Sequence, residues 1–122
     1  MSDNSPAEEN KEPKAAQPAP ATPASRPPAP GSQAEELAAF LGKDVVLDTR
    51  GELLYVGRLE HVGEWFLTLV DADVHDLSDS RTRKDVYLIE AARFGVKKNR
   101  HQVMVRSREV VSLSTLASVI LY

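Results

Sequence analysis

The chain has 122 residues, a formal net charge of −3 and no cysteine. This length has room for one small domain, and a charge so near zero does not by itself indicate a nucleic acid or an acidic partner. The lack of cysteine excludes disulfide frameworks, thiolate metal sites and cysteine nucleophiles. The sequence shows neither a signal-peptide pattern nor an apolar run of membrane-spanning length, so we expect a soluble cytoplasmic protein without a membrane partner.

Residues 1–31 differ in composition from the rest of the chain. All eight prolines lie in this segment, which contains almost no large apolar side chain. Such a segment cannot bury enough apolar surface to offset the entropy lost on ordering, which predicts a disordered Pro/Ala-rich tail. Its proline pairs resemble ligands of aromatic-lined grooves and so allow a protein partner for the tail, with a solubilising linker as the alternative. Residues 32–122 then form the folded domain.

A short helix is predicted where the folded domain begins. Ser32 is followed three residues later by Glu35, which is the capping-box pattern. Gly42 supplies a C-terminal stop. The apolar residues that recur at helical spacing in between are Leu37, Phe40 and Leu41. A helix of two or three turns is not stable alone in water, so we expect this stripe to pack on the strands that follow.

The next segment predicts a meander of antiparallel strands. Apolar and β-branched runs at residues 45–47, 53–62 and 65–70 are separated by turn signals rich in Gly, Asp and Glu. Gly57 lies in the middle of the second run, where a glycine usually marks a sharp bend or a close approach of two backbones. A bend at this point suits a strand that serves both halves of a small barrel.

Acidic residues and a histidine follow the third run. Strand alternation would place Asp71, Asp73 and His75 on one face, where they could hold a divalent metal or supply a general base. Their spacing matches no established metal loop, and acidic segments are usually solvated turns. We therefore predict no catalytic residue, no metal ligand and no cofactor, and a protein that is not an enzyme.

A long hairpin with a basic tip is predicted after the acidic segment. Residues 86–89 form an apolar run, the chain turns at Gly95 or Asn99, and residues 103–105 return as a strand. Six basic side chains against one glutamate make residues 93–109 the most basic stretch of the chain. Such a cluster can contact a phosphate backbone, and a solvated tip balanced by nearby acids is the alternative. The candidate RNA-binding residues are Lys97, Lys98, Arg100, His101, Arg106 and Arg108.

The order of these elements resembles that of the Sm-like family, and the resemblance covers residues 34 to about 113. In the second family motif it depends on Val105-Arg106 and Val110-Val111. In the first motif it depends on Gly57-Arg58-Leu59, Val62, Leu67, Leu69 and Asp71-Ala72. The resemblance implies a mainly β fold, a strongly bent five-stranded Sm-like or SH3-like barrel with a short N-terminal α-helix. With the extended hairpin between the third and fourth strands, the chain resembles a divergent bacterial-type member.

Most base-binding residues of the RNA-binding Sm-like proteins are absent from this chain. The resemblance would place an Asp in the turn after the second strand, where only Gly63-Glu64 is present. The family's Asn falls on Phe66, and its Arg-Gly pair falls on Arg106-Ser107. The Tyr/Phe-Lys-His motif of the bacterial Sm-like RNA chaperone is also missing. Arg106 alone is carried over as a base-pocket residue.

The resemblance leaves two functions open. Sm-like chains commonly assemble into rings by pairing the fourth strand of one subunit with the fifth strand of the next, here residues 103–106 and 110–113. It therefore implies a homo-oligomeric RNA-binding or RNA-chaperone-type module. The alternative is a non-enzymatic protein-interaction or assembly module that kept the barrel and lost the RNA pocket.

Overall fold

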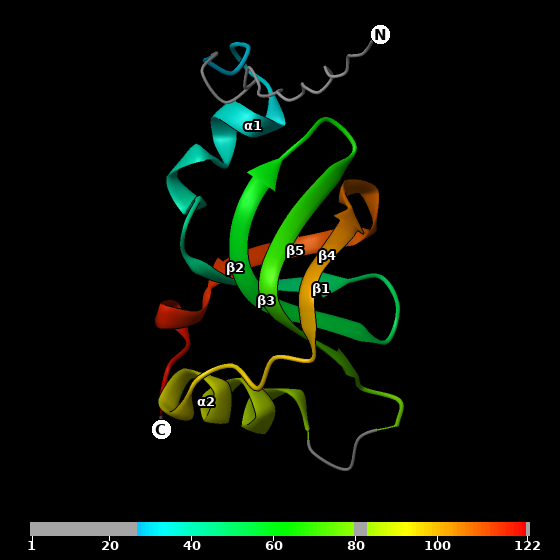
Figure 1. Ribbon diagram of the computed structural model, residues 1–122. Helices are drawn as coiled ribbons and strands as arrows, with labels where there is room; N and C mark the ends of the chain where they lie inside the picture. Colours follow the sequence, from blue (N-terminus) through cyan, green and yellow to red (C-terminus); the bar gives the residue numbers. More distant parts are fainter. Residues whose placement is uncertain (1–26, 80–82, 122) are drawn as a thin grey trace, which may run out of the picture.

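The computed structural model describes residues 27–79 and 83–121. Figure 1 shows one bent sheet, with α1 near one end of the molecule and α2 near the other. The elements in chain order are α1 (Gln33–Glu36), the 3-10 turn η3 (Ala38–Phe40), β1 (Asp44–Thr49), β2 (Leu53–Val62), β3 (Phe66–Asp76), α2 (Lys84–Phe94), β4 (Arg100–Arg106), η4 (Ser107–Glu109), β5 (Val110–Thr115) and η5 (Leu116–Ser118). Most of the predicted tail lies outside the described residues, so its disorder and the boundary at residue 31 stay predictions.

All five strands are antiparallel and lie in one sheet, in the order β4-β3-β2-β1-β5. The mainly β architecture and the short N-terminal helix agree with the fold that the Sm-like resemblance implies. In the part of the chain that the structure describes, β4 pairs only with β3 and β5 only with β1. The sheet therefore stays open, with β4 and β5 at its two edges, and the predicted closed barrel is not confirmed.

The pairing of β2 and β3 is interrupted at Gly57. The pairing register shifts between Val56 and Arg58, opposite Asp71, whose φ is +49°. A Cβ atom built on Gly57 would lie 2.7 Å from the Cβ of Ala72, closer than two carbon atoms can approach without a shift. The predicted close backbone approach at Gly57 is therefore confirmed.

The sheet buries an apolar core on each of its faces. Successive residues of a strand point to opposite faces, so Val45 and Leu47 enter one core while Val46 enters the other. Leu37 and Phe40, from the N-terminal helical segment, pack on the first core. The other buried residues of the first core are Leu59, Val62, Leu67, Leu69, Ala72 and Val105. The other buried residues of the second core are Leu54, Val56, Ala91 and Leu116.

The predicted cap of α1 by Ser32 is confirmed, while the reciprocal bond from Glu35 reaches the residue before the cap. Ser32 Oγ accepts a hydrogen bond from the backbone N–H of Glu35 at 3.1 Å, and Glu35 Oε1 accepts one from the N–H of Gly31 at 2.6 Å. The helix is shorter than expected, because after four residues it continues as η3. Leu41 is 45 % exposed and does not belong to the packed stripe.

Residues 84–94 form a helix, so the predicted extended hairpin between β3 and β4 is wrong. The apolar run at 86–89 suits either a strand or a buried helix, and the strong helix formers of Glu90-Ala91-Ala92-Arg93 favour a helix. The side chains of Tyr87, Leu88, Ala91 and Ala92 follow one helical face and pack on the second core. Burial of this face against the sheet stabilises the helix over the strand.

Among the described residues, no helix is long and apolar enough to cross a membrane.

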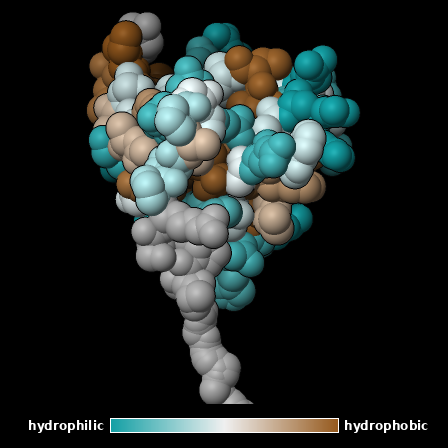
Figure 2. Space-filling view, turned by 90° about the horizontal axis from the view of Figure 1, so that it is seen from above, coloured by the Kyte–Doolittle hydropathy of each residue, from teal (hydrophilic) through white to brown (hydrophobic). Residues whose placement is uncertain are grey.

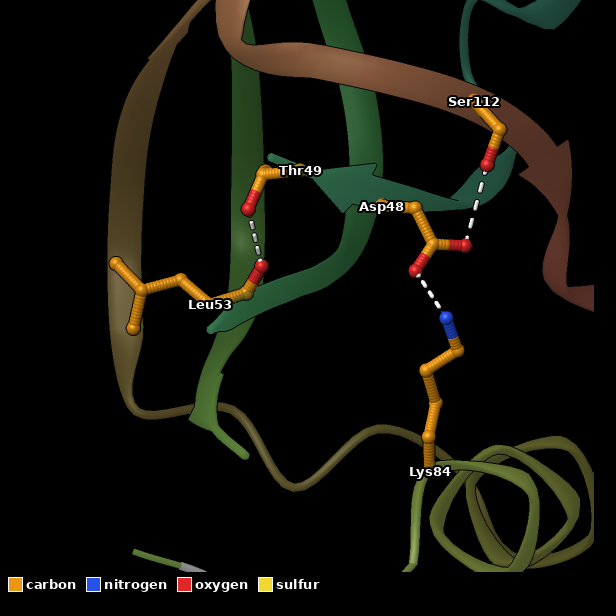
Figure 3. Close-up of polar contacts among 5 residues, drawn as sticks. All are labelled: Asp48, Thr49, Leu53, Lys84 and Ser112. Atoms are coloured by element: carbon orange, nitrogen blue, oxygen red, sulfur yellow. Dashed lines mark hydrogen bonds and ion pairs between the residues drawn. The ribbon is translucent and has the colours of Figure 1, made fainter. Parts of the chain in front are cut away.

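One carboxylate attaches α2 to the sheet. Lys84 Nζ, at the start of α2, lies 2.5 Å from Asp48 Oδ1 on β1. Ser112 Oγ, on β5, donates a hydrogen bond of 3.1 Å to the other oxygen, Asp48 Oδ2 (Figure 3). Beside it, Thr49 Oγ1 donates to the carbonyl oxygen of Leu53 at 2.6 Å, which closes the β1–β2 turn. Asp48 thus links β1, β5 and α2.

Candidate nucleic-acid interface

Two turns meet at the end of the sheet near α1. The backbone N–H of Ser107, in η4, donates to the carbonyl oxygen of Trp65 at 2.8 Å, and the N–H of Gly63 donates to the carbonyl of Phe66 at 2.9 Å. Gln33 Nε2 of α1 donates both to the Gly63 carbonyl at 3.0 Å and to Ser107 Oγ at 2.8 Å. The helix therefore holds the β2–β3 turn and the β4–β5 turn together.

A cavity of about 300 Å³ lies between these turns, and we call it the turn cavity. Trp65 is 59 % exposed at this cavity. The guanidinium of Arg106 lies over the ring of Phe66, with Cζ 5.6 Å from the ring centroid, which fits a cation–π contact between paired residues of β3 and β4. The lining residues are Gln33, Glu64, Trp65, Arg106, Ser107 and Arg108.

The cations at the turn cavity are available for a ligand. In residues 27–79 and 83–121, no carboxylate forms an ion pair with Arg106 or Arg108. Arg50 Nε donates to the main-chain oxygen of Arg108 at 3.0 Å, which brings a third guanidinium to the same turn. An exposed indole beside unpaired guanidinium groups is an arrangement that can stack a base and contact a phosphate.

The remaining candidate residues lie at the opposite end of β4. They are Lys97 and Lys98 after α2, and Arg100 and His101 at the start of β4. A strand of seven residues extends roughly 20 Å, so these side chains and Arg106 are not one cluster. Lys98 Nζ lies 3.7 Å from Asp71 Oδ1, and Arg58 Nη1 lies 3.2 Å from Asp71 Oδ2. The hairpin tip predicted for Lys97, Lys98, Arg100 and His101 does not form, because residues 84–94 are a helix and the two lysines lie on the linker between α2 and β4.

An exposed face of β4 connects the two basic groups. Residues alternate along a strand, so Arg100, Gln102, Met104 and Arg106 point to one side, and all four are exposed. Val105 points to the other side and is buried in the first core. The strand therefore presents an arginine at each end of one continuous exposed face.

Asp71, Asp73 and His75 do not share one strand face. The bulge at Asp71 places its carboxylate against Arg58 and Lys98, whereas Asp73 and His75 line a cavity under α2. Within the described ranges, no group of three or more His, Asp or Glu side chains could hold a metal ion. The metal alternative weighed from the sequence thus has no set of ligands in this part of the chain.

Asp73 and His75 instead contact a tyrosine of α2. The rings of His75 and Tyr87 are stacked, with centroids 4.0 Å apart and planes 11° from parallel. The Tyr87 hydroxyl donates a short hydrogen bond to Asp73 Oδ2. Burial, and then the hydrogen bond to Asp73, raise the pKa of Tyr87 well above its ordinary value. His75 Nε2 is buried and has no hydrogen-bond partner among the described residues.

Sequence reasoning missed Trp65 and Tyr87 as site residues. It assigned Trp65 to an apolar strand, whereas β3 begins at Phe66 and Trp65 remains in the turn. A tryptophan directly after a Gly-Glu turn was the signal that could have marked an exposed ring. Other large apolar side chains are exposed as well, and in the view from above in Figure 2 hydrophobic residues form separate patches among hydrophilic ones.

No protein-family model matches this chain, and a search of curated proteins finds no significant match. Among solved structures it is similar to the Pyrococcus abyssii Sm protein in complex with a uridine heptamer, with a TM-score of 0.46, 19 % identity and coverage of 68 % of this chain and 96 % of that one. It is also similar to an Sm-like protein of Archaeoglobus fulgidus, with a TM-score of 0.45 and 21 % identity. That match covers 72 % of this chain and 99 % of the other. A chain of the NatC complex bound to CoA is similar with a TM-score of 0.41 and 20 % identity. That match covers 63 % of this chain and 79 % of the other.

Two of these structures are an Sm protein and an Sm-like protein, the family that the sequence resembles. Likenesses this weak say nothing of what this chain binds.

Proposed function

We propose that this chain is a non-enzymatic Sm-like protein that binds single-stranded RNA at the turn cavity and acts in the cytoplasm. The observation that carries the proposal is the convergence of exposed Trp65 and unpaired Arg106 and Arg108 on one cavity. A base can stack on the indole, since every base has a π-face, while the guanidinium groups contact phosphate oxygens. Stacking on the indole and contacts to phosphate oxygens are the same for every base, so we expect little sequence preference.

The second basic group extends the proposed RNA path. Arg100 and Arg106 stand at the two ends of the exposed face of β4, roughly 20 Å apart, a distance that a strand of several nucleotides can span. Lys98 is already paired with Asp71, so its share of the binding is expected to be smaller than that of Arg106. The turn cavity is therefore the proposed anchor, and the lysine end a supporting contact.

We further propose that the chain forms homo-oligomers by pairing β4 of one copy with β5 of the next. Both strands are edges of the sheet in a single chain, and an unpaired edge is a template for another strand. Each edge also exposes a large apolar side chain, Met104 at 58 % and Val111 at 62 %. Such pairing would repeat the exposed face of β4, and with it the RNA contacts, in every subunit.

The test is fluorescence anisotropy with uridine-rich, adenine-rich and mixed oligoribonucleotides at low and near-physiological salt. We expect salt-dependent binding with similar affinity for the three sequences. Arg106→Gln with Arg108→Gln should weaken it at least about tenfold at low salt, because two phosphate contacts are lost. Lys97→Gln, Lys98→Gln and Arg100→Gln together should weaken it less, and Lys43→Gln, a lysine away from the cavity, serves as the matched control.

Three results would reject this proposal. The first is an absence of binding even at low salt, which would favour the protein-interaction module that lost its RNA pocket. The second is an equal loss per removed charge in the Lys43→Gln control, which would indicate attraction by net charge alone. The third is a larger loss in the lysine-end variant than in the Arg106 and Arg108 variant, which would place the anchor at the other end of β4.

A further inference from the structure

A second and larger cavity, of about 580 Å³, lies between β3 and α2, and we call it the helix cavity. It shares no lining residue with the turn cavity. Its volume is in the range of pockets that bind small molecules. The lining residues are Asp73, His75, Tyr87, Glu90, Ala91, Phe94, Gly95, Val96 and Lys97.

A buried carboxylate forms part of the cavity wall. Asp73 is only 7 % exposed, and it accepts a hydrogen bond from the neutral hydroxyl of Tyr87. Burial and the hydrogen bond to Asp73 raise the pKa of Tyr87, so its hydroxyl stays protonated and neutral. The hydroxyl can therefore donate a hydrogen bond to Asp73 but cannot balance the negative charge of its carboxylate. Among the described residues, no cation forms an ion pair with Asp73. Buried carboxylates normally have a cationic partner, so a cation in the cavity would supply what the chain lacks.

Aromatic rings line the same cavity. His75 and Tyr87 form the stacked pair beside Asp73, and the Phe94 ring is 81 % exposed at the end of α2. The face of an aromatic ring carries negative electrostatic potential and attracts ammonium and guanidinium groups. An aromatic side chain this exposed packs little on the folded chain, and a ligand in the cavity would cover its apolar surface.

Two further features favour positive charge in the helix cavity. Glu90 adds a second carboxylate to its lining, and Gly95, the C-cap of α2, places the negative end of an eleven-residue helix there. Lys97 is the opposing feature, because its ammonium group also lines the cavity. It is exposed on the linker to β4 and can turn toward solvent.

We propose that the helix cavity binds an organic cation, an alkylguanidinium or alkylammonium group. In this proposal the positive charge of the ligand lies against Asp73, and its alkyl part lies between Tyr87 and Phe94. A divalent metal fits less well, because no group of three or more His, Asp or Glu side chains in the described ranges is arranged to hold one. The shared chemistry allows two sources, a free amine or guanidine and the arginine side chain of a peptide. This site shares no residue with the turn cavity, and Lys97 is the one residue that it has in common with the supporting end of the proposed RNA path.

The test is a titration of the ¹⁵N-labelled full chain, followed by ¹H–¹⁵N spectra, with L-argininamide and with choline. Urea at the same concentration is the neutral control, and sodium chloride is matched throughout. An arginine-containing tetrapeptide and its citrulline analogue then distinguish a free cation from a peptide-borne one. We expect saturable shifts at Asp73, Tyr87 and Phe94 with the cationic probes and none with urea or the citrulline peptide.

Variants assign the binding to these side chains. Phe94→Ala should weaken it about two- to fivefold through loss of a cation–π contact, and Asp73→Asn about tenfold or more through loss of a charged partner. Because Asp73→Asn changes a buried group, Glu90→Gln on the exposed side of α2 serves as the variant that should fold normally and still bind more weakly. Lys97→Gln should bind more tightly, and Glu109→Gln, an exposed acid elsewhere, should not change the affinity.

Four results would overturn the proposal. The first is that no cationic probe shifts the signals of the lining residues, and the second is that urea shifts them equally. The third is that neither Glu90→Gln nor Phe94→Ala changes the affinity. The fourth is that magnesium or zinc ions shift the signals and organic cations do not.

Discussion

Gly57 of β2 and Ala72 of β3 lie so close that there is no room for one added carbon between them. A Cβ atom on Gly57 would be 2.7 Å from the Ala72 Cβ and 2.9 Å from its Cα. The contact lies where the register of the two strands shifts and where Asp71 takes a φ of +49°. The missing side chain of Gly57 thus allows the bulge that turns Asp73 and His75 toward α2.

The Gly57→Ala variant should unfold more easily than the parent chain. The added methyl group meets backbone and Cβ atoms that cannot rotate away, and overpacking of this kind typically costs about 1–3 kcal/mol. The measurement is urea unfolding followed by circular dichroism. Gly51→Ala is the matched control, because nothing lies within 4 Å of its added Cβ and its φ is not positive. An equal or smaller loss for Gly57→Ala than for Gly51→Ala would contradict the steric account.

Trp65→Ala should weaken RNA binding while leaving its salt dependence almost unchanged. A stacked base contributes about 1–3 kcal/mol, or roughly five- to 150-fold in affinity, and stacking releases no counterions. By contrast, Arg106→Gln should reduce the slope of log affinity against log salt by about one phosphate contact. The measurement is anisotropy over a salt series with one oligonucleotide.

Trp65→Phe provides the control for this prediction. It keeps an aromatic face at a position that is 59 % exposed and should restore most of the affinity lost with alanine. A Trp65→Phe variant as weak as Trp65→Ala would indicate that the indole supports the turn rather than a base. The melting temperatures of the variants separate the two explanations.

A single lysine substitution on either edge strand should dissociate the proposed oligomer without unfolding the chain. Met104→Lys on β4 and Val111→Lys on β5 place an ammonium group where a neighbouring strand would pack, and both positions are more than half exposed in the single chain. Light scattering should then report a lower mass for either variant. Ile120→Lys, at a position 68 % exposed outside the strands, is the control. A parent chain that is monomeric at high concentration would reject the oligomer itself.

The meander and its bend were predictable from sequence because their signals are local. Gly57 interrupts an apolar run, and the bounds expected for the second strand are those of β2. The secondary structure of residues 86–89 was not predictable in this way. Four consecutive apolar residues fit either a strand or a helix, and the surface on which they pack decides between the two. That surface is formed by Val46, Leu54 and Val56, which are distant in sequence.

The candidate site was predictable only in part for the same reason. Arg106 could be named because a family motif contains it, but its neighbour Trp65 is separated from it by β3, α2 and β4. The helix cavity depends on the insertion of α2 and on a one-residue bulge at Asp71, and neither follows from alternation along the strand. Pairings between distant residues therefore decided which side chains form each cavity.

Tyr87→Phe should destabilise the chain at neutral pH and make its stability less sensitive to alkali. Loss of the hydroxyl leaves the buried Asp73 without its donor, at a cost of about 1–3 kcal/mol. Because the pKa of Tyr87 is raised in the folded chain, the unfolded chain releases this proton first as the pH rises. The contribution of Tyr87 to stability is therefore complete below its ordinary pKa of about 10 and is lost progressively above it.

The measurement for Tyr87 is urea unfolding of the parent chain and the variant at about pH 8 and about pH 11, on either side of the ordinary tyrosine pKa. The difference in unfolding free energy between them should shrink at the higher pH, by up to about 1.4 kcal/mol per pH unit for one proton. Tyr55→Phe, which leaves the bond between Tyr87 and Asp73 in place, corrects for the general effect of alkali. A difference that stays constant between the two pH values would show that the Tyr87 hydroxyl ionises as readily in the folded chain as in the unfolded one.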